Sequence, residues 1–204
     1  SALGDAASPT LIQAAARAES KREGIGLILA SADFNQDGYP DIYVGNDFHE
    51  DDYYYLNNGD GTFSNVTVEA GIVYEGFGLG MAVADVNKDG YPDLYISNDY
   101  ISNDLLYINQ KDGTFKNEIA RLMSYQTKSS MGSDMADINN DGFPDMFTLD
   151  MMPEYYHKKK ATINGFGYIY YINDAKYGYE HQYLRNMMHM HNGLINGEMV
   201  PYSE

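Results

Sequence analysis

Small residues alternate with larger apolar residues in three short stretches of the chain, and a polar turn follows each stretch. Such alternation suits an inner β-strand, where neighbouring backbones crowd together and leave room only for small side chains. The three stretches are 27–32, 78–84 and 131–136. After each polar turn, a run of β-branched and aromatic residues predicts a second strand, at Asp41–Val44, Asp93–Ile96 and Asp145–Thr148.

The polar turn has the same pattern each time, Asp-x-Asn-x-Asp-Gly-x-Pro-Asp. It occupies residues 33–41, 85–93 and 137–145, so that successive copies lie 52 residues apart. The Pro comes just before the second strand, where its missing N–H removes no ladder hydrogen bond. We therefore expect a tight turn between two strands in every copy.

The repeat continues beyond the second strand. Residues 55–63 match residues 107–115 at the same spacing, and both segments contain the Asp-Gly pair of a β-hairpin. Each unit thus predicts four antiparallel strands, which is typical of a β-propeller blade. The predicted fold class is all-β, with three propeller blades. Because propellers generally have four to eight blades, we expect these to be part of a larger propeller in a longer chain. The predicted division is a non-repeat segment at 1–24 and blades at 25–76, 77–128 and 129–204.

The residues of the turn motif form a set of hard oxygen donors. The first, third, fifth and ninth residues offer side-chain oxygens, the seventh offers its backbone carbonyl, and the Gly at position six permits a sharp turn. Ca²⁺ prefers six to eight such oxygens, and three neighbouring carboxylates need a counter-charge. We therefore predict three Ca²⁺ sites, with the ligands Asp33, Asn35, Asp37, Tyr39, Asp41, Asp85, Asn87, Asp89, Tyr91, Asp93, Asp137, Asn139, Asp141, Phe143 and Asp145.

The motif resembles an EF-hand loop for nine residues and then departs from it. An EF-hand needs Glu at position 12, which is Val44, Ile96 or Thr148 here. An Asp-Gly pair alone would mark only a hairpin turn, but the further oxygen ligands at fixed offsets in three copies favour a metal site. We favour a structural role for calcium, with regulation as the alternative.

A glycine-rich strand followed by this turn motif resembles the FG-GAP repeat, also called the VCBS-type repeat. It is similar to the calcium-binding blades of integrin α-subunit propellers. The segment at residues 55–63 resembles more closely the bacterial relatives of cartilage acidic protein, which carry ASPIC/UnbV-type domains. The resemblance covers residues from about 25 to 150. It implies calcium at the matching Asp and Asn positions, a secreted or surface-anchored protein, and protein or glycan ligands.

The third unit breaks the repeat. The counterpart of its hairpin, Met190–Gly193, comes about 30 residues late, so residues 151–183 are predicted to be an insertion. Insertions in repeat folds form loops on one face, often the binding face. The aromatic residues of this insertion could recognise sugars or proteins, or pack over a blade edge and close the ring. They are Tyr155, Tyr156, Phe166, Tyr168, Tyr170, Tyr171, Tyr177, Tyr179 and Tyr183.

Three histidines near the end of the chain suggest a transition-metal site. His189 and His191 alternate, which places them on one face of a strand. The chain has no Cys and no His-Glu-x-x-His spacing. We therefore interpret these two residues and His181 as ordinary packed or surface histidines.

Charge narrows the range of partners. The net charge is −17, and the basic run Lys158–Lys160 is expected to be a solvated loop. Nucleic acid is disfavoured because phosphate binding needs clustered Lys and Arg. The chain has no disulfides, which leaves stapling of the fold to calcium. It also has no apolar run long enough for a transmembrane helix.

No signature of a Ser/His/Asp hydrolase, a phosphate loop or a zinc enzyme occurs in the sequence. We therefore predict a non-enzymatic, calcium-stabilised binding or scaffold module that is extracellular or at the cell surface, either secreted or on a bacterial outer membrane. Its ligand is expected to be a protein or a carbohydrate, bound through the Tyr-rich insertion. Two alternatives stay open: a catalytic or non-catalytic part of a larger surface hydrolase acting on glycans or lipids, and a subunit held in a larger assembly.

Overall fold

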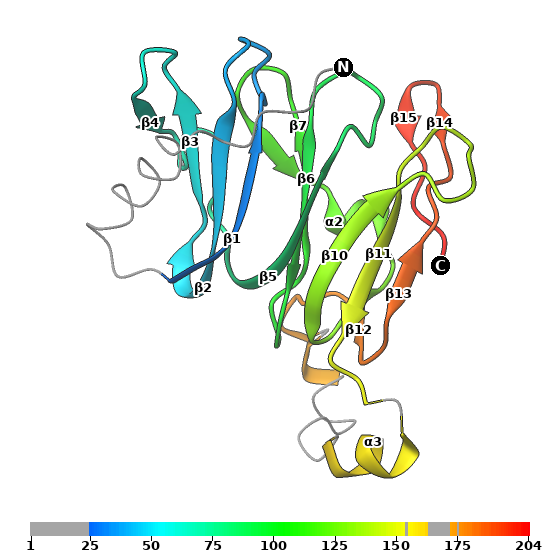
Figure 1. The fold of residues 1–204 in the computed structure, drawn as a ribbon. Helices are drawn as coiled ribbons and strands as arrows, with labels where there is room; N and C mark the ends of the chain where they lie inside the picture. The colour runs from blue at the N-terminus through cyan, green and yellow to red at the C-terminus, as the bar shows by residue number, and fades with distance from the viewer. Residues whose placement is uncertain (1–24, 154, 163–171, 175) are drawn as a thin grey trace, which may run out of the picture.

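Antiparallel β-strands dominate the computed structural model, which describes residues 25–153, 155–162, 172–174 and 176–204 (Figure 1). The predicted N-terminal segment 1–24 lies outside the described residues. The strands are β1 (Ile25–Ala32), β2 (Asp41–Asp51), β3 (Tyr53–Asn57), β4 (Phe63–Asn65), β5 (Glu75–Ala84), β6 (Asp93–Asn98), β7 (Leu105–Asn109), β8 (Phe115–Asn117), β9 (Gln126–Thr127), β10 (Ser130–Ala136), β11 (Asp145–Asp150), β12 (Gln182–Tyr183), β13 (Met187–His189), β14 (Leu194–Ile195) and β15 (Glu198–Met199).

The first two units fold into four-stranded propeller blades, as the sequence predicts. The strands β1 to β4 pair in antiparallel succession, and β5 to β8 repeat the pattern. In the third unit, β11 lies between β10 and β13. The pair of residues that opens onto the polar turn is equivalent in all three units: Ala32 with Asp41, Ala84 with Asp93, and Ala136 with Asp145.

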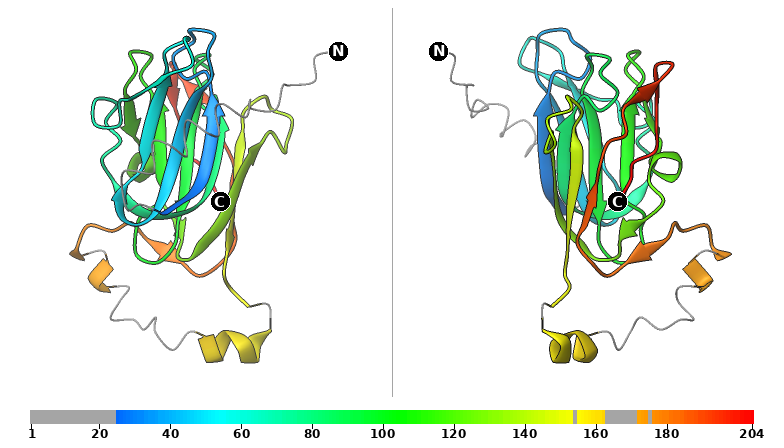
Figure 2. Two further views of the ribbon diagram at one scale, coloured as in Figure 1. Left: turned by 60° about the vertical axis from the view of Figure 1, so that its left-hand side comes forward. Right: turned by 90° about the vertical axis from the view of Figure 1, so that its right-hand side faces the viewer.

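The first two blades are more closely joined than the repeat predicts. The end of β2 pairs with the start of β5 through Asp47 with Phe77 and Asp51 with Glu75. The two blades therefore share one curled eight-stranded sheet, which Figure 2 shows from two further sides.

Crowding of the inner strands is confirmed at Gly80 in β5. A Cβ atom there would lie 2.6 Å from the Gly132 Cα and 2.7 Å from the Ser133 backbone nitrogen of β10. Backbone atoms cannot yield as a flexible side chain can, so only glycine permits this approach of the second and third blades.

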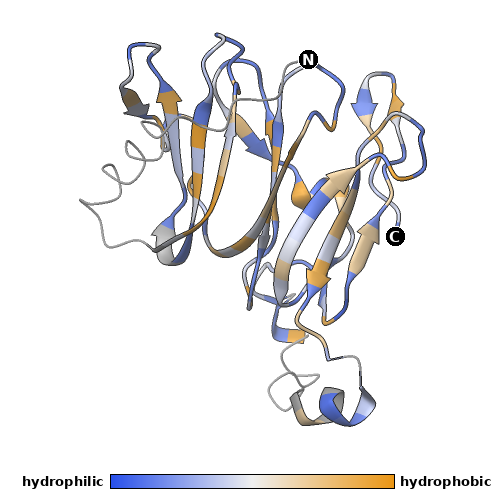
Figure 3. Cartoon of the chain, viewed as in Figure 1, coloured by the Kyte–Doolittle hydropathy of each residue, from blue (hydrophilic) through white to orange (hydrophobic). Residues whose placement is uncertain are grey.

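Apolar side chains fill both junctions between blades. One buried cluster combines Phe34, Tyr43 and Tyr54 of the first blade with Leu94, Tyr107 and other residues of the second. Another combines second-blade residues such as Val86 and Tyr95 with Met146 and Tyr202, and with the short helix α2 (Ile119–Leu122). Figure 3 shows orange, apolar segments along these strands and blue, polar turns at their ends. Burying one such side chain contributes roughly 1.5–3 kcal/mol, against about 0.5–1.5 kcal/mol for a hydrogen bond, so packing is the main force between blades.

Polar side chains also connect successive blades. Asn109 donates its Nδ2–H to the Phe34 carbonyl oxygen at 2.8 Å. In the third blade, the Nε2 of His191 lies 3.0 Å from the Val86 carbonyl oxygen, while its Nδ1 accepts the Gly193 N–H at 2.8 Å. The ring proton is therefore on Nε2, which donates to Val86. Burial lowers the pKa of His191 and keeps the ring neutral.

His189 and His191 are both buried, which agrees with their interpretation as packed residues, whereas His181 is exposed. Among the described residues, three or more His, Cys, Asp or Glu side chains nowhere gather to hold a metal ion. His191 is the structural equivalent of Asn109. The backbone N–H of each residue donates a hydrogen bond to the ninth Asp of the turn in its own blade.

The insertion leaves the third blade at the end of β11, and its helix α3 (Tyr156–Thr162) stands clear of the strands in Figure 2. The run Lys158–Lys160 was expected to be a loop, but it lies in helix α3. A stretch of good helix formers with no Gly or Pro explains this difference. The insertion returns to the blades through β12, which pairs in parallel with β9.

The aromatic residues of the insertion have mixed surroundings. Tyr155, Tyr156 and Tyr177 are well exposed. Tyr179 is half-buried, and Tyr183 makes an edge contact with Tyr125 at 5.5 Å between ring centres. Phe166, Tyr168, Tyr170 and Tyr171 lie outside the described residues.

A buried tyrosine and a buried aspartate form a pair in each of the first two blades. Tyr95 donates its hydroxyl hydrogen to the Asp104 carboxylate at 2.6 Å, and the Asn98 N–H donates to its other oxygen at 2.8 Å. Burial raises the pKa of Asp104 to about 7. In the first blade, Tyr43, Asp52 and Asn46 form the same arrangement. Burial raises the pKa of Asp52 to about 6.

We expect His191→Ala to lower the free energy of unfolding by about 2–4 kcal/mol, because it leaves the Val86 carbonyl unpaired and opens a cavity beside Phe143 and Tyr202. His191→Asn should recover about 1 kcal/mol of that loss, because its amide can replace both ring hydrogen bonds. Urea unfolding of the three proteins measures this order. Equal destabilisation by Ala and Asn would contradict the assigned role.

Asp104→Asn should change how stability depends on pH. The Asp104 carboxyl has a higher pKa in the folded chain than in the unfolded chain, where Asp titrates near about 3.9. Its contribution to stability is therefore complete below about pH 4 and is lost as the pH rises through about 7. Between pH 5 and pH 8, the wild type should lose stability relative to the Asn variant.

Thermal unfolding of both proteins at pH 5, 6.5 and 8 tests this prediction, and other carboxylates cancel in the difference. Asp52→Asn serves as a matched comparison, whose change should be complete near pH 6 instead of near pH 7. A difference between wild type and Asp104→Asn that is independent of pH would refute the prediction.

Candidate functional site

The three polar turns lie at the same end of their blades. They connect β1 with β2, β5 with β6, and β10 with β11. In Figure 1 they point toward the top, while helix α3 lies at the bottom. The blades therefore present two chemically different ends.

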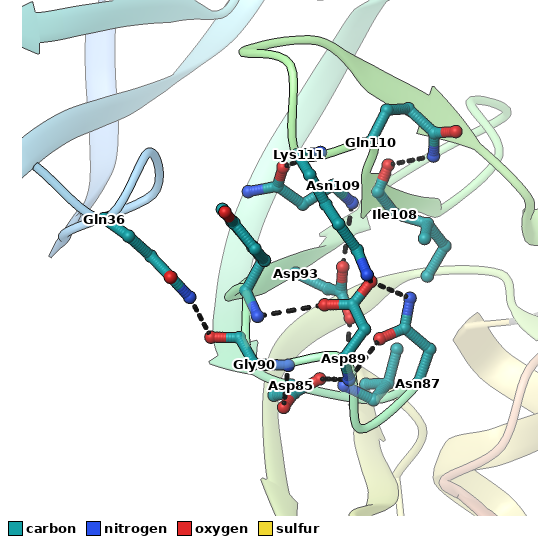
Figure 4. Close-up of polar contacts among 12 residues, drawn as sticks. Gln36, Asp85, Asn87, Asp89, Gly90, Asp93, Ile108, Asn109, Gln110 and Lys111 are labelled. Carbon is teal, nitrogen blue, oxygen red and sulfur yellow. Dashed lines mark hydrogen bonds and ion pairs between the residues drawn. The ribbon is translucent and has the colours of Figure 1, made fainter.

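A fixed set of hydrogen bonds shapes the second turn (Figure 4). The Asp85 carboxylate accepts the Asp89 N–H at 3.0 Å and the Gly90 N–H at 2.9 Å. The Asn87 side-chain oxygen also accepts the Asp89 N–H, at 3.0 Å, and Asp89 in turn accepts the Tyr91 N–H at 2.9 Å. The side chains at positions one, three and five are thereby gathered around one turn of backbone.

The first and third turns repeat these hydrogen bonds at equivalent atoms. The fourth residue has a left-handed backbone in every copy, with φ of 61°, 58° and 60° at Gln36, Lys88 and Asn140. The sixth residue has φ near 90° in all three, which glycine adopts without steric cost. The three turns therefore share one conformation.

The ninth residue lies beneath its turn and is fully buried. Asp93 accepts the Val86 N–H at 2.9 Å with one oxygen and the Asn109 N–H at 2.8 Å with the other. Burial, with the charges of Asp89 and Asp85 as a smaller cause, raises the pKa of Asp93 to about 7, although its two backbone hydrogen bonds lower it. The pKa of Asp41 is also raised, chiefly by burial.

The donor chemistry of each turn fits a hard cation, but the acidic groups do not converge fully. In the described part of the chain, no three His, Cys, Asp or Glu side chains come together as a ready metal-binding group. A cation would draw on two Asp carboxylates, an Asn oxygen and the carbonyl of the seventh residue, which is Tyr39, Tyr91 or Phe143. It would share the ninth Asp with two backbone N–H groups, which each carboxylate oxygen can do because it has two lone pairs.

Several residues that sequence analysis missed contact the turns. Gln36 donates its side-chain N–H to the Gly90 carbonyl at 2.6 Å, and the Lys88 ammonium lies 5.9 Å from the centre of the Phe143 ring. Both are fourth residues that reach the next turn along the chain. Lys111 forms an ion pair with Asp89 at 3.3 Å (Figure 4). Gln36 and Lys88 occupy the fourth position of the motif, whereas Lys111 lies outside it. No sequence pattern predicts which residue any of the three side chains contacts.

The asparagines that hold the ninth Asp could have been found from the repeat. Asn57 and Asn109 occupy matching places 52 residues apart, and each donates its backbone N–H to the ninth Asp of its own turn. His191 has this place in the third blade, where the late hairpin hides the correspondence. Among the described helices, none is long and apolar enough to cross a membrane.

Comparison with known proteins agrees with this geometry. The family model of the FG-GAP-like repeat matches residues 33–96 and 85–148, which together span more than half of the chain. Human integrin alpha-7 is 33% identical over 103 residues, which cover 45% of this chain and 9% of the integrin. Bovine phosphatidylinositol-glycan-specific phospholipase D is 29% identical over 150 residues, covering 60% of this chain and 18% of the enzyme.

The chain thus spans less than a fifth of the length of either relative. The residues that the family model matches contain all three polar turns. On the strength of the family match and the observed blades, this chain belongs to the FG-GAP-like repeat family.

Proposed function

We propose that the three turns bind Ca²⁺ and that the ion stabilises the blades. The donors at each turn are the hard oxygens that calcium prefers. The buried Asp93 illustrates the need for a counter-charge, since burial and two neighbouring carboxylates raise its pKa to about 7. A bound divalent cation would favour the charged form of each ninth residue. The observation that carries this proposal is the identical hydrogen-bonded conformation of three turns with the same donors.

On this basis, the chain acts as a non-enzymatic binding module that is secreted or at the cell surface. Membership in a repeat family that includes part of an integrin supports this function. The closer resemblance to bacterial cartilage-acidic-protein-like proteins stays a prediction. The ligand is a protein or a glycan, bound away from the turns, where the insertion adds aromatic side chains.

A second function follows from the bovine relative. A phospholipase D shares 29% identity with this chain, so these blades could belong to a larger surface hydrolase, with or without taking part in its chemistry. Turnover of a glycan or lipid substrate by this chain alone would favour that function, and saturable binding without turnover would favour the binding module.

Calcium should raise the melting temperature of the chain, and EDTA should lower it. At 10 to 100 times the Kd, one site adds roughly 1.4–2.7 kcal/mol of stability. The triple variant D37N/D89N/D141N should lose most of this gain, because it removes one charge from each turn while Asn can still accept the N–H of the seventh residue.

Differential scanning calorimetry with and without Ca²⁺, and with Mg²⁺ as a competing ion, makes the measurement. The control is Asp112→Asn, because Asp112 is an exposed hairpin residue that holds Thr114 in a similar local turn without belonging to the motif. The proposal would be wrong if the melting temperature of the wild type were the same with added Ca²⁺ and after Ca²⁺ is removed.

The ion pair between Lys111 and Asp89 should lower the calcium affinity of the second turn, because the ammonium group competes with the cation for the Asp89 carboxylate. The equivalent residues of the other units are Gly59 and Gly193, as their hydrogen bonds show. Lys111→Gly should raise the affinity of this turn by about 2- to 5-fold, as expected for an exposed ion pair. Lys116→Gly, a change of another exposed lysine in the second blade, is the control. Calcium titration calorimetry of these variants in a D37N/D141N background isolates the second turn, and equal affinities would contradict the prediction.

A further inference from the structure

A cavity of about 330 Å³ opens at the second blade, at the end opposite the polar turns. Its walls come from the start of β5 (Tyr74–Phe77), the connection from β6 to β7 (Ile101–Leu105), Asn117 at the end of β8, and Tyr179 of the insertion. Four segments far apart in the sequence therefore meet here. The volume lies at the lower end of the range for small-molecule sites, which is about 300–1,000 Å³.

Aromatic rings line the cavity and are held in place by other rings. Phe77 makes an edge contact with Tyr100, with 5.1 Å between ring centres. The Tyr74 ring packs against the buried Tyr107 ring, with 6.4 Å between ring centres, and Tyr74 is 48% exposed. Tyr179 adds a half-buried ring from the insertion. The cavity thus offers fixed apolar faces, with hydroxyl groups on its two tyrosines.

Amide groups in the wall have a defined orientation. The Asn117 side-chain oxygen accepts the N–H groups of Leu106 and Ile119. The Asn103 side-chain oxygen accepts the Glu180 N–H at 3.0 Å. Both side chains therefore have their oxygens occupied and keep their Nδ2 groups as donors.

The described residues provide no hydrogen-bond partner for these two Nδ2 groups, nor for the Glu75 carboxylate or the Ser102 hydroxyl. The wall thus combines donors, an acceptor and hydroxyls that a ligand can pair with. Polar groups of this kind fix the orientation of a ligand in a pocket.

The insertion holds this wall rigid. Gln182 donates its side-chain N–H groups to the carbonyl oxygens of Ile101 and Ser102, both at 3.1 Å. The Lys128 ammonium pairs with Asp174 at 3.0 Å, where both side chains are largely buried. The hydrogen bonds of Gln182 connect the insertion to the β6–β7 segment of the wall, and a wall held by such contacts lowers the entropic cost of binding.

The chemistry of the cavity selects among ligands. The described residues that line it include no Lys or Arg, and the chain has a net charge of −17, so phosphate, sulfate and nucleic acid are disfavoured. Amide donors, a carboxylate, hydroxyls and rings side by side match a sugar, which has hydroxyls at its edge and apolar C–H groups on its face. A protein ligand would need a larger contact area than this cavity provides.

We infer that the cavity at the second blade, closed on one side by Tyr179 of the insertion, binds a short neutral saccharide. This inference rests on the proposed binding function and gives its ligand class. Tyr74 and Tyr179 provide faces for the sugar ring, and Glu75, Asn103 and Asn117 pair with its hydroxyls. The Tyr-rich insertion then acts through one ring at the cavity, and its exposed residue Tyr177 takes no part.

The test uses the intact chain with Ca²⁺ on an array of neutral, sialylated and sulfated oligosaccharides. Isothermal titration then follows with the neutral saccharide that gives the strongest signal. We expect Tyr179→Ala and Glu75→Ala each to weaken binding about 10-fold or more, with unchanged melting temperatures, since neither side chain holds the blades together. Tyr177→Ala, an aromatic truncation two residues away on the exposed part of the same insertion, should bind as the wild type does.

Three outcomes would overturn the inference. In the first, the folded chain shows no saturable binding of any neutral saccharide. In the second, both pocket variants bind as the wild type does, and in the third, the chain prefers an anionic glycan or an Arg-rich control peptide. The calcium response of the same samples separates the two proposals. If calcium raises the melting temperature and no sugar binds, only the saccharide site fails; if sugar binds without a calcium effect, only the calcium sites fail.

Discussion

The second residue of the first and second polar turns joins its turn to the neighbouring blade, and the fold depends on this junction. Its N–H donates to the buried ninth Asp, and its carbonyl accepts a hydrogen bond from Asn109 or His191 of the next blade. Its side chain, Phe34 or Val86, lies in the apolar core between blades. A buried polar group without a partner costs about 1–3 kcal/mol, so turn, strand end and blade interface have to form together. Ile138, the second residue of the third turn, is 49% exposed, because no further blade follows among the described residues.

The two ends of the blades differ in chemistry. At one end, each acidic turn lies over a buried carboxylate. Because the second residue of the turn contacts both this carboxylate and the next blade, neutralising the carboxylate charge would also stabilise the junction between blades. At the other end, the connections from β2 to β3 and from β6 to β7 repeat one arrangement of buried Tyr, Asp and Asn residues. The third unit reaches the second there through Gln182 and Glu180. On the proposed functions, the calcium sites and the saccharide site lie at opposite ends of the blades.

Most of the fold could be predicted from the sequence, because strand period, turn glycines and the 52-residue spacing are local features. The blades followed from them, as did the crowding at Gly80. The exceptions involve contacts between distant segments. The pairing of β2 with β5, the replacement of Asn109 by His191, and the ion pair of Lys111 with Asp89 have no local signature. The helical run Lys158–Lys160 was missed because the charge of a segment does not reveal its conformation.

The sequence by itself determined the repeated strand–turn–strand unit and the oxygen donors of its turns, since both depend on residue types at short, fixed offsets. It left open what the Tyr-rich insertion does. Only the tertiary structure decided that Tyr179 faces a cavity with Glu75 and Asn117, while Tyr177 stays exposed. It also decided that each ninth Asp is buried under its turn and shared with the next strand. The physical reason is that Tyr179 and Glu75 are far apart in the chain and meet only in the folded blades, while burial of the ninth Asp depends on the strands that cover it.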